Sequence, residues 1–229
     1  LYEQGGYLAL LLLRAGAVAL IGLLLFSYLW QGVRRGGPLL AFAIAGAIAL
    51  MLLDGRLHQV RPHMITYLGI LCFLWILEFR PRWSWLLPLL TVVWANLHGV
   101  TWVLAALIGG AYFLDALYRR YREGVRDAST AWPYLTGIAL CAPALLLNPR
   151  GLAILTAPFA VPENIDRFIA ELQPLAPSSF QTLQLSGMQL GNASLITLFT
   201  LLVLLAFVRA AMQDRLRLAH LVMAAGGAY

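Results

Sequence analysis

The sequence has no lysine and carries little charge of either sign. Its 16 basic residues are all arginines, set against 10 acidic residues, and only 11% of the 229 residues are charged while 61% are hydrophobic. With a mean hydropathy of +0.79, this composition excludes an ordinary soluble domain and indicates an integral membrane protein. The net charge of +6 does not indicate a nucleic-acid partner, because the arginines lie where membrane-protein loops carry them.

Cysteine is scarce as well, and a secretion signal is not evident. Cys72 and Cys141 both fall inside apolar runs, so we interpret them as small buried hydrophobic residues rather than as a disulfide or a metal site. The first residue is not Met, and no charged segment precedes an apolar one as in a signal peptide. The pattern of apolar segments is already under way at Leu1, and an apolar run has barely begun at Tyr229. We therefore expect this chain to be an internal piece of a longer protein.

Long apolar segments fill the space between the arginines, and a helix needs roughly 20 such residues to cross a bilayer. They predict an all-α fold, a polytopic transmembrane helix bundle of about seven to eight spans with interfacial helices on the outer face. The expected spans are Ala15–Trp30, Pro38–Leu53, Met64–Phe79, Trp83–Ala95, Val100–Tyr118, Trp132–Leu147 and Ala193–Val208, with another beginning at Leu218–Tyr229. We divide the chain into an interfacial helix (residues 1–14), a transmembrane bundle (15–147), an outer amphipathic and loop segment (148–192) and further transmembrane helices (193–229).

The arginines gather in alternate gaps between these segments. The dense gaps hold Arg34, Arg35, Arg80, Arg82, Arg119, Arg120, Arg122, Arg126, Arg209, Arg215 and Arg217, and the sparse gaps hold Arg56, Arg61, Arg150 and Arg167. Short cytoplasmic loops of membrane proteins carry an excess of basic residues. The arginine-rich loops are therefore predicted to be cytoplasmic, and the sparse gaps to face outward.

One apolar stretch is too long to be a single span. As one helix, Trp83–Tyr118 would run roughly 54 Å at about 1.5 Å per residue, against a hydrocarbon core of about 30 Å. Its one polar interruption is Asn96-Leu97-His98-Gly99, so we predict a break there. The arm before the break is only about 20 Å long, which would place Asn96 and His98 below the outer surface. A second polar turn, Asn148–Gly151, follows another short span, and together the two turns imply an outward-facing vestibule.

Several outward-facing polar residues are candidates for a phosphate site. The segment from Asp54 to His63 contains Arg56, Arg61 and two histidines, and guanidinium groups match phosphate oxygens bidentately. The alternative is a solvated loop whose arginines contact lipid headgroups or Asp54. His98 is either a hydrogen-bonded structural residue or a ligand.

The remaining polar residues favour structural roles. Arg150 either completes a turn with Asn148 or contacts an anion. Two carboxylates, Glu78 and Asp115, lie near predicted cytoplasmic helix ends and are expected to pair with neighbouring arginines. The histidines lack carboxylates at ligand spacing, so we predict no metal site.

Short motifs in a fixed order resemble bacterial integral-membrane proteins of the GT-C glycosyltransferase superfamily. They are Leu1-Tyr2-Glu3, Arg61-Pro62-His63, Trp94-Ala95-Asn96-Leu97-His98-Gly99, Asn148-Pro149-Arg150-Gly151 and Ile169-Ala170-Glu171-Leu172-Gln173-Pro174. The resemblance covers most of the chain. It implies a transferase of the bacterial inner (plasma) membrane that uses a polyprenyl-phosphate-linked sugar on the outer face.

The resemblance also implies where the chemistry would lie. The catalytic acidic residue of this superfamily is expected upstream of Leu1, which leaves Glu3 and Asp54 as the candidates within this chain. The expected phosphate-binding residues are Arg56, Arg61, His63, Asn96, His98 and Arg150. A divalent cation is left open as a cofactor, and the expected partners are membrane lipid, the polyprenyl-phosphate donor and other membrane subunits.

Two other classes of protein fit the same pattern. Because the chain holds no clear acid–base pair, it could be a non-catalytic transmembrane subunit or scaffold of a larger membrane complex. A vestibule could equally be the gate of a transporter for a lipid-linked substrate.

Overall fold

The structure, a computed structural model, describes residues 2–57, 62–123, 128–159 and 217–227, with scattered positions between 201 and 212. All secondary structure in these residues is helical, as the all-α prediction requires. The chain divides into two compact units, and each is described by itself. The first comprises residues 1–28, 60–160 and 217–229, and the second comprises residues 29–59 and 161–216.

The long first helix, α1 (Tyr2–Arg34), kinks near its start. Gly6 has a φ of 56° and a ψ of −153°, a backbone conformation that only glycine adopts without strain. The chain then continues as one helix to Arg34. Large apolar side chains are exposed along it, among them Tyr7, Leu12 and Phe26, and almost none of its apolar stretch is buried.

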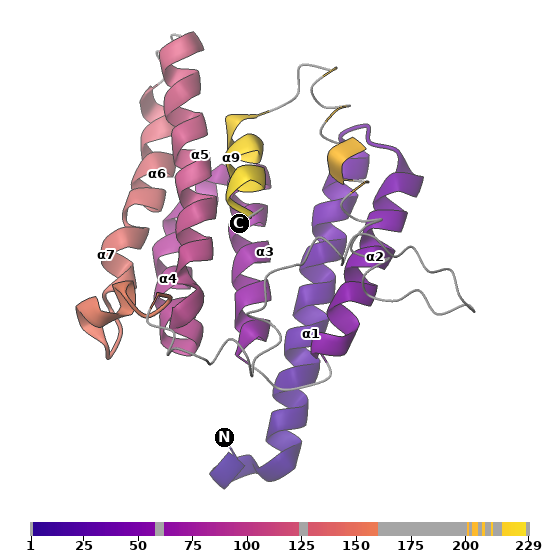
Figure 1. The fold of residues 1–229 in the computed structure, drawn as a ribbon, viewed down its shortest axis with the longest axis vertical. Helices are drawn as coiled ribbons and strands as arrows, with labels where there is room; N and C mark the ends of the chain where they lie inside the picture. The colour runs from indigo at the N-terminus through magenta and orange to yellow at the C-terminus, as the bar shows by residue number, and fades with distance from the viewer. Residues whose placement is uncertain are drawn as a thin grey trace. The chain divides into compact units, whose positions relative to one another are not determined.

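The first unit packs its other helices into a bundle (Figure 1). They are α3 (His63–Phe79), the 3₁₀ turn η1 (Pro81–Leu86), α4 (Leu87–His98), η2 (Gly99–Thr101), α5 (Trp102–Glu123), α6 (Ala128–Ala139), α7 (Cys141–Leu145), η3 (Gly151–Leu155) and α9 (Leu218–Gly227). Their common core contains Phe73, Leu87, Trp94, Ala111 and Tyr112. Burying such aromatic and aliphatic side chains fixes the order of the helices around them.

The predicted break after α4 is confirmed. His98 has a φ of −148° and a ψ of 65°, which ends the helical geometry, and α4 and α5 then pack against each other as a hairpin. The expected spans at 132–147 and 218–229 correspond to the helices α6–α7 and α9.

Glycine lets two elements of this unit approach closely. A Cβ atom on Gly137 of α6 would lie 2.5 Å from the backbone oxygen of Ser84 in η1. Since real Cβ atoms essentially never approach that closely, α6 can lie against η1 only because residue 137 has no side chain. Ser84 is itself only 1% exposed.

The second unit is described through the end of α1 and through α2 (Leu39–Leu57). Gly36, with a φ of 89°, turns the chain between them, and Gly32 and Gly37 leave room for the ring of Phe42. Because α2 extends to Leu57, Asp54 and Arg56 lie in a helix rather than in the loop that was predicted. The side chains of residues 51–61 lie outside the described residues, as do Arg61 and the whole of 160–200.

Two stretches of the described residues are long and apolar enough to cross a membrane, Gly6–Arg34 and Pro81–Tyr121. The second contains the break at His98. His63–Phe79 and Tyr134–Leu145 are shorter apolar helices. The count of seven to eight spans therefore stays a prediction.

Candidate functional site

The turn after α7 is built by one asparagine side chain. The Asn148 Oδ1 atom accepts a hydrogen bond from the Arg150 backbone nitrogen at 2.7 Å, and its Nδ2 donates to the Leu145 carbonyl oxygen at 2.7 Å. Gly151 completes the turn with a φ of 52°. Asparagine forms such turns because its short side chain mimics backbone, and glycine supplies the left-handed residue. The Asn-Pro-Arg-Gly sequence thus specifies its own local shape.

This turn lies against the break between α4 and α5. The Asn96 Nδ2 atom donates to the Leu147 carbonyl oxygen at 2.8 Å and to the Val92 carbonyl oxygen at 2.8 Å. The Trp102 indole donates to the Ile154 carbonyl oxygen at 2.9 Å. The structure therefore brings together the two polar turns that the sequence singled out, and it shows that Asn96 holds them in place.

A hydrogen-bonded cluster of neutral side chains fills the interior beside the break. The Trp94 indole donates to Thr101 Oγ1 at 2.9 Å, and Thr101 donates to the His98 carbonyl oxygen at 3.0 Å. Thr66 Oγ1 lies 2.7 Å from His98 Nδ1 and 2.8 Å from Thr101 Oγ1. The cluster joins α3 to the α4–α5 hairpin, so His98 is a hydrogen-bonded structural residue here.

The protons of this cluster can be assigned by counting donors. Each threonine hydroxyl has one proton to donate, and Thr101 uses its proton on the His98 carbonyl. All four contacts are satisfied together only if Thr66 donates to Thr101 and the His98 Nδ1–H donates to Thr66. We therefore assign His98 as the Nδ1–H tautomer, a choice that rests on the hydrogen-bond network. The other ring nitrogen, Nε2, then carries a lone pair.

His63 lies at the start of α3, one turn before Thr66. Its Nε2 atom is buried without a hydrogen-bond partner among the described residues, and its ring meets the ring of Tyr67 edge-on, with the centroids 5.8 Å apart. A buried polar atom is normally satisfied. The residues before it in the chain, including Arg61, lie outside the described part.

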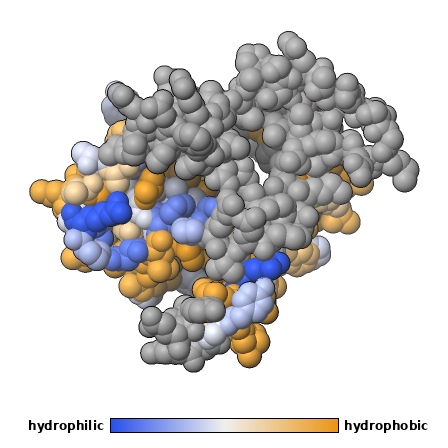
Figure 2. All heavy atoms as spheres, turned by 60° about the horizontal axis from the view of Figure 1, so that its bottom comes forward, coloured by the Kyte–Doolittle hydropathy of each residue, from blue (hydrophilic) through white to orange (hydrophobic). Residues whose placement is uncertain are grey.

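Arg150 is the charged residue of the Asn148–Gly151 turn. It is exposed, and no described residue accepts a hydrogen bond from its guanidinium. Figure 2, which turns this end toward the viewer, shows hydrophilic side chains gathered among hydrophobic ones. Of the other predicted site residues, Glu3, Asp54, Arg56 and Arg61 have side chains outside the described residues.

An apolar cavity of about 370 Å³ lies next to the two turns. Leu145 and Leu155, which flank the Asn148–Gly151 turn in sequence, and Trp102 are part of its wall. Small residues of α5, Ala105, Ala106, Gly109 and Gly110, form much of the rest. Sequence reasoning missed this cavity, because it arises where α5 packs against α6 and α7.

A second polar cluster lies at the opposite end of the same bundle, and it is charged. Glu78 Oε2 accepts hydrogen bonds from Arg217 Nη1 at 2.8 Å and from the Tyr112 hydroxyl at 3.1 Å, and His220 Nε2 lies 4.0 Å away. The Glu78 side chain is only 10% exposed.

The carboxylate of Asp115 in turn pairs with Arg119 at 2.8 Å. The predicted pairing with a neighbouring arginine is thus confirmed for Asp115. Glu78 pairs instead with Arg217, which lies 139 residues away in the sequence and which no local signal indicated.

Comparisons with models of known protein families, with curated proteins and with solved structures find no match to this chain. Within the described residues, no group of three or more His, Cys, Asp or Glu side chains could hold a metal ion.

Proposed function

We propose that the chain is part of an integral membrane protein that binds a polyprenyl phosphate at the end carrying Arg150, as a GT-C-like glycosyltransferase does with its sugar donor. The observation that carries the proposal is the apolar cavity beside the two joined polar turns. A polyprenyl phosphate has an anionic head and an apolar tail. It needs a cation next to an apolar wall, and this end of the bundle offers both.

The membrane location is supported by the surface of α1. A helix with apolar residues on all sides is either buried in a core or surrounded by lipid. In the first unit α1 leaves Leu8, Leu12 and Leu23 about two-thirds exposed, which in water would be a large apolar surface and a liability. In a bilayer these side chains would contact lipid, so the free-energy cost of exposing them to water would not arise. By the distribution of arginines, Arg150 then faces outward and Arg120 faces the cytoplasm.

The proposed chemistry is displacement of the polyprenyl phosphate by an acceptor hydroxyl. The hydroxyl oxygen forms a bond to the sugar, the bond from the sugar to the phosphate breaks, and a carboxylate takes the hydroxyl proton. Glu3 and Asp54 are the candidate carboxylates of this chain. Arg150 would stabilise the leaving phosphate, because guanidinium groups bind phosphate oxygens strongly in partly dry sites. Arg56 and Arg61 are the other predicted phosphate contacts.

A second candidate function is a transmembrane scaffold within a larger complex. It is favoured by the use that the structure makes of Asn96 and His98, whose hydrogen bonds hold helices together. The two described carboxylates, Glu78 and Asp115, are paired with arginines at the other end of the bundle.

Binding of farnesyl phosphate to the full-length protein in detergent micelles separates the two functions. Arg150→Ala and Arg61→Ala are each expected to weaken binding by about 1.5–3 kcal/mol, the range for a charge-assisted hydrogen bond, or roughly ten- to a hundredfold. Arg150→Lys should recover only part of the loss, because it keeps the charge but not the planar fork. Arg82→Ala, an exposed arginine of another loop, is the control. Unchanged affinity in both variants, with both proteins folded, would favour the scaffold.

A further inference from the structure

Two adjacent glycines in the middle of a helix line the apolar cavity beside the two turns. They are Gly109 and Gly110 of α5. Glycine in the interior of a helix destabilises it relative to alanine, because glycine loses more conformational freedom on folding. A glycine at such a position therefore needs a reason, either in the packing of the helix or in its function.

Packing accounts for Gly109 but not for Gly110. A Cβ atom on Gly109 would lie 3.4 Å from Cγ2 of Ile138 in α6, so a side chain any longer than that of alanine would press against α6. A Cβ atom on Gly110 would meet no atom of the described residues within 4 Å. Gly110 therefore leaves a notch about the size of a methyl group in the wall of the cavity.

Other small residues continue this wall. Ala105 and Ala106 lie one turn before the two glycines on α5, while Ala139 of α6 and Ala142 of α7 line the cavity as well. A chain with short branches fits a wall of this kind, because the branches enter the spaces that small residues leave, as side chains do in a packed interior. A straight alkyl chain has no group that would fill the notch at Gly110.

We propose that the cavity prefers a methyl-branched chain, the isoprenoid tail of a polyprenyl phosphate, over a straight alkyl chain, and that Gly110 determines this preference. The inference rests on the proposed function, in which Arg150 binds the phosphate, and it adds the residue that recognises the tail. A methyl branch of the tail lies where the Cβ atom of residue 110 is missing. The space that costs the helix stability is then used to bind the ligand.

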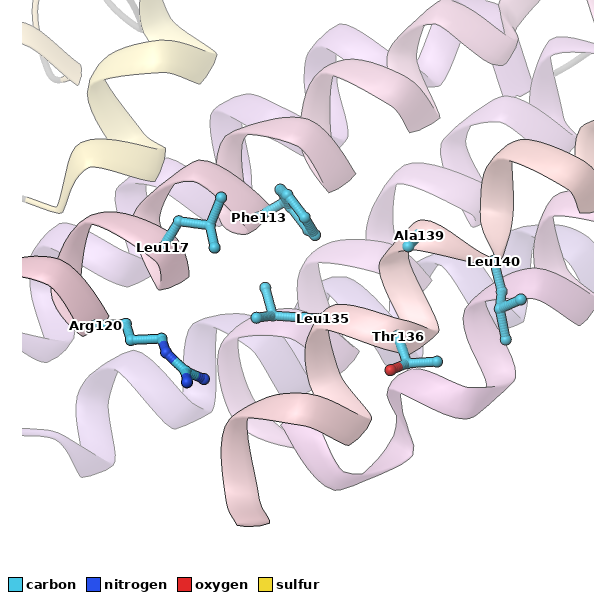
Figure 3. A pocket seen from close by; sticks show the side chains of 7 residues that line it. All are labelled: Phe113, Leu117, Arg120, Leu135, Thr136, Ala139 and Leu140. Carbon is cyan, nitrogen blue, oxygen red and sulfur yellow. The ribbon is translucent and has the colours of Figure 1, made fainter. Parts of the chain in front are cut away.

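A neighbouring groove is a different place in which the tail could lie. It has a volume of about 530 Å³ and lies between α5 and α6, with Arg120 and Thr136 among its lining residues (Figure 3). Phe113 and Ala139 line both hollows, whereas Gly110 lines only the cavity and Thr136 only the groove. Variants at Gly110 and Thr136 therefore distinguish the two hollows.

The test compares two ligands that share a phosphate and the length of the main chain. Farnesyl phosphate carries methyl branches, and dodecyl phosphate carries none. The full-length protein in detergent micelles should bind farnesyl phosphate about tenfold more tightly, the effect of one methylene-sized group in an apolar pocket. Gly110→Ala should remove most of this preference by weakening the binding of farnesyl phosphate alone. The variant should be no less stable than the wild-type protein, since alanine favours the helix.

Two further variants are controls. Gly22→Ala makes the same change in α1, where a Cβ atom also meets no atom of the described residues within 4 Å, and Gly22 does not line the cavity. Thr136→Phe fills the groove. Both variants should leave the affinities for the two phosphates unchanged.

The outcomes separate this inference from the proposed function. Equal affinities of the wild-type protein for the two phosphates, or an equal loss of both in Gly110→Ala, would overturn the preference for a branched chain. A preference that Gly110→Ala leaves intact and Thr136→Phe removes would place the tail in the groove and overturn the role of Gly110. In these cases a loss of affinity in Arg150→Ala would still support the proposed function. If neither phosphate bound the wild-type protein, both the proposed function and this inference would fail.

Discussion

The two ends of the bundle in the first unit contain different kinds of interior polar groups. At the end of Glu78 the interior polar groups are charged, and a carboxylate of α3 pairs with Arg217, the residue before α9. At the end of His98 they are neutral. Threonine, histidine and tryptophan side chains of α3, α4 and η2 form hydrogen bonds with one another there. Both carboxylates whose side chains the structure describes, Glu78 and Asp115, belong to the charged end.

The difference lies in where charged side chains are paired within the bundle. A buried charge must keep its partner, because an unpaired ion in an apolar interior is costly. The charged groups at the Glu78 end are paired with one another, so breaking a pair to bind a ligand would cost free energy. At the other end Thr66, Trp94, His98 and Thr101 form a neutral hydrogen-bonded network. The arginine of the turn, Arg150, is exposed there.

The largest effect is expected from Glu78→Gln. The variant takes the ionic partner from Arg217, whose side chain is 33% exposed, and weakens the contact with the Tyr112 hydroxyl. Breaking a buried pair costs about 3–5 kcal/mol. Partial exposure of Arg217 lowers this cost, so we expect the free energy of unfolding in detergent micelles to fall by about 2–3 kcal/mol. Arg82→Gln, the exposed control, should change it by less than about 0.5 kcal/mol. Equal stabilities of the two variants would show that the Glu78–Arg217 pair does not stabilise the bundle.

At the neutral end, Thr101→Val should have the next largest effect. Valine has nearly the shape of threonine but cannot accept the proton of the Trp94 indole, and Trp94 is only 2% exposed. A buried donor left without an acceptor costs about 1–3 kcal/mol, so the free energy of unfolding should fall by about 2 kcal/mol. Thr136→Val, on the exposed face of α6, is the matched control and should be nearly neutral. A Thr101→Val variant as stable as the control would mean that the network does not hold the hairpin.

Gly151→Ala tests the backbone of the Asn148 turn by itself. No atom lies within 4 Å of the added Cβ, so the cost comes only from the φ of 52°, about 1–2 kcal/mol for a residue other than glycine. Gly110→Ala in α5 also meets open space, yet it should stabilise the helix by about 0.5–1 kcal/mol. Thermal unfolding of the pair should therefore shift in opposite directions. A shift in the same direction would contradict the role given to the turn.

The smallest effect on stability is expected from Arg150→Ala. The side chain is exposed and holds no described partner, so the free energy of unfolding should change by less than about 0.5 kcal/mol. The same variant is expected to lose binding of farnesyl phosphate, and this contrast with Glu78→Gln sharpens the comparison of the two ends. A large loss of stability in Arg150→Ala would indicate that Arg150 has a structural role.

Much of this arrangement followed from the sequence alone. Its composition indicated helices and a membrane, and the length of Trp83–Tyr118 required a break that the polar residues placed at Asn96–Gly99. The turn at Asn148–Gly151 was equally local, since Asn and Gly specify it by their own conformational preferences. The pair Asp115–Arg119 lies one helical turn apart, and such pairs can be read from spacing.

What the sequence could not decide depends on side chains that meet from distant segments. Nothing near Glu78 indicates that Arg217, 139 residues later, completes its pairing, and His98 acquired its structural role only through Thr66, 32 residues earlier. The groove at Arg120 and the cavity beside Trp102 exist because α5 and α6–α7 leave space where they pack. Local preferences act over one or two turns of chain, whereas these contacts arise from the packing of the core, which only the tertiary structure specifies.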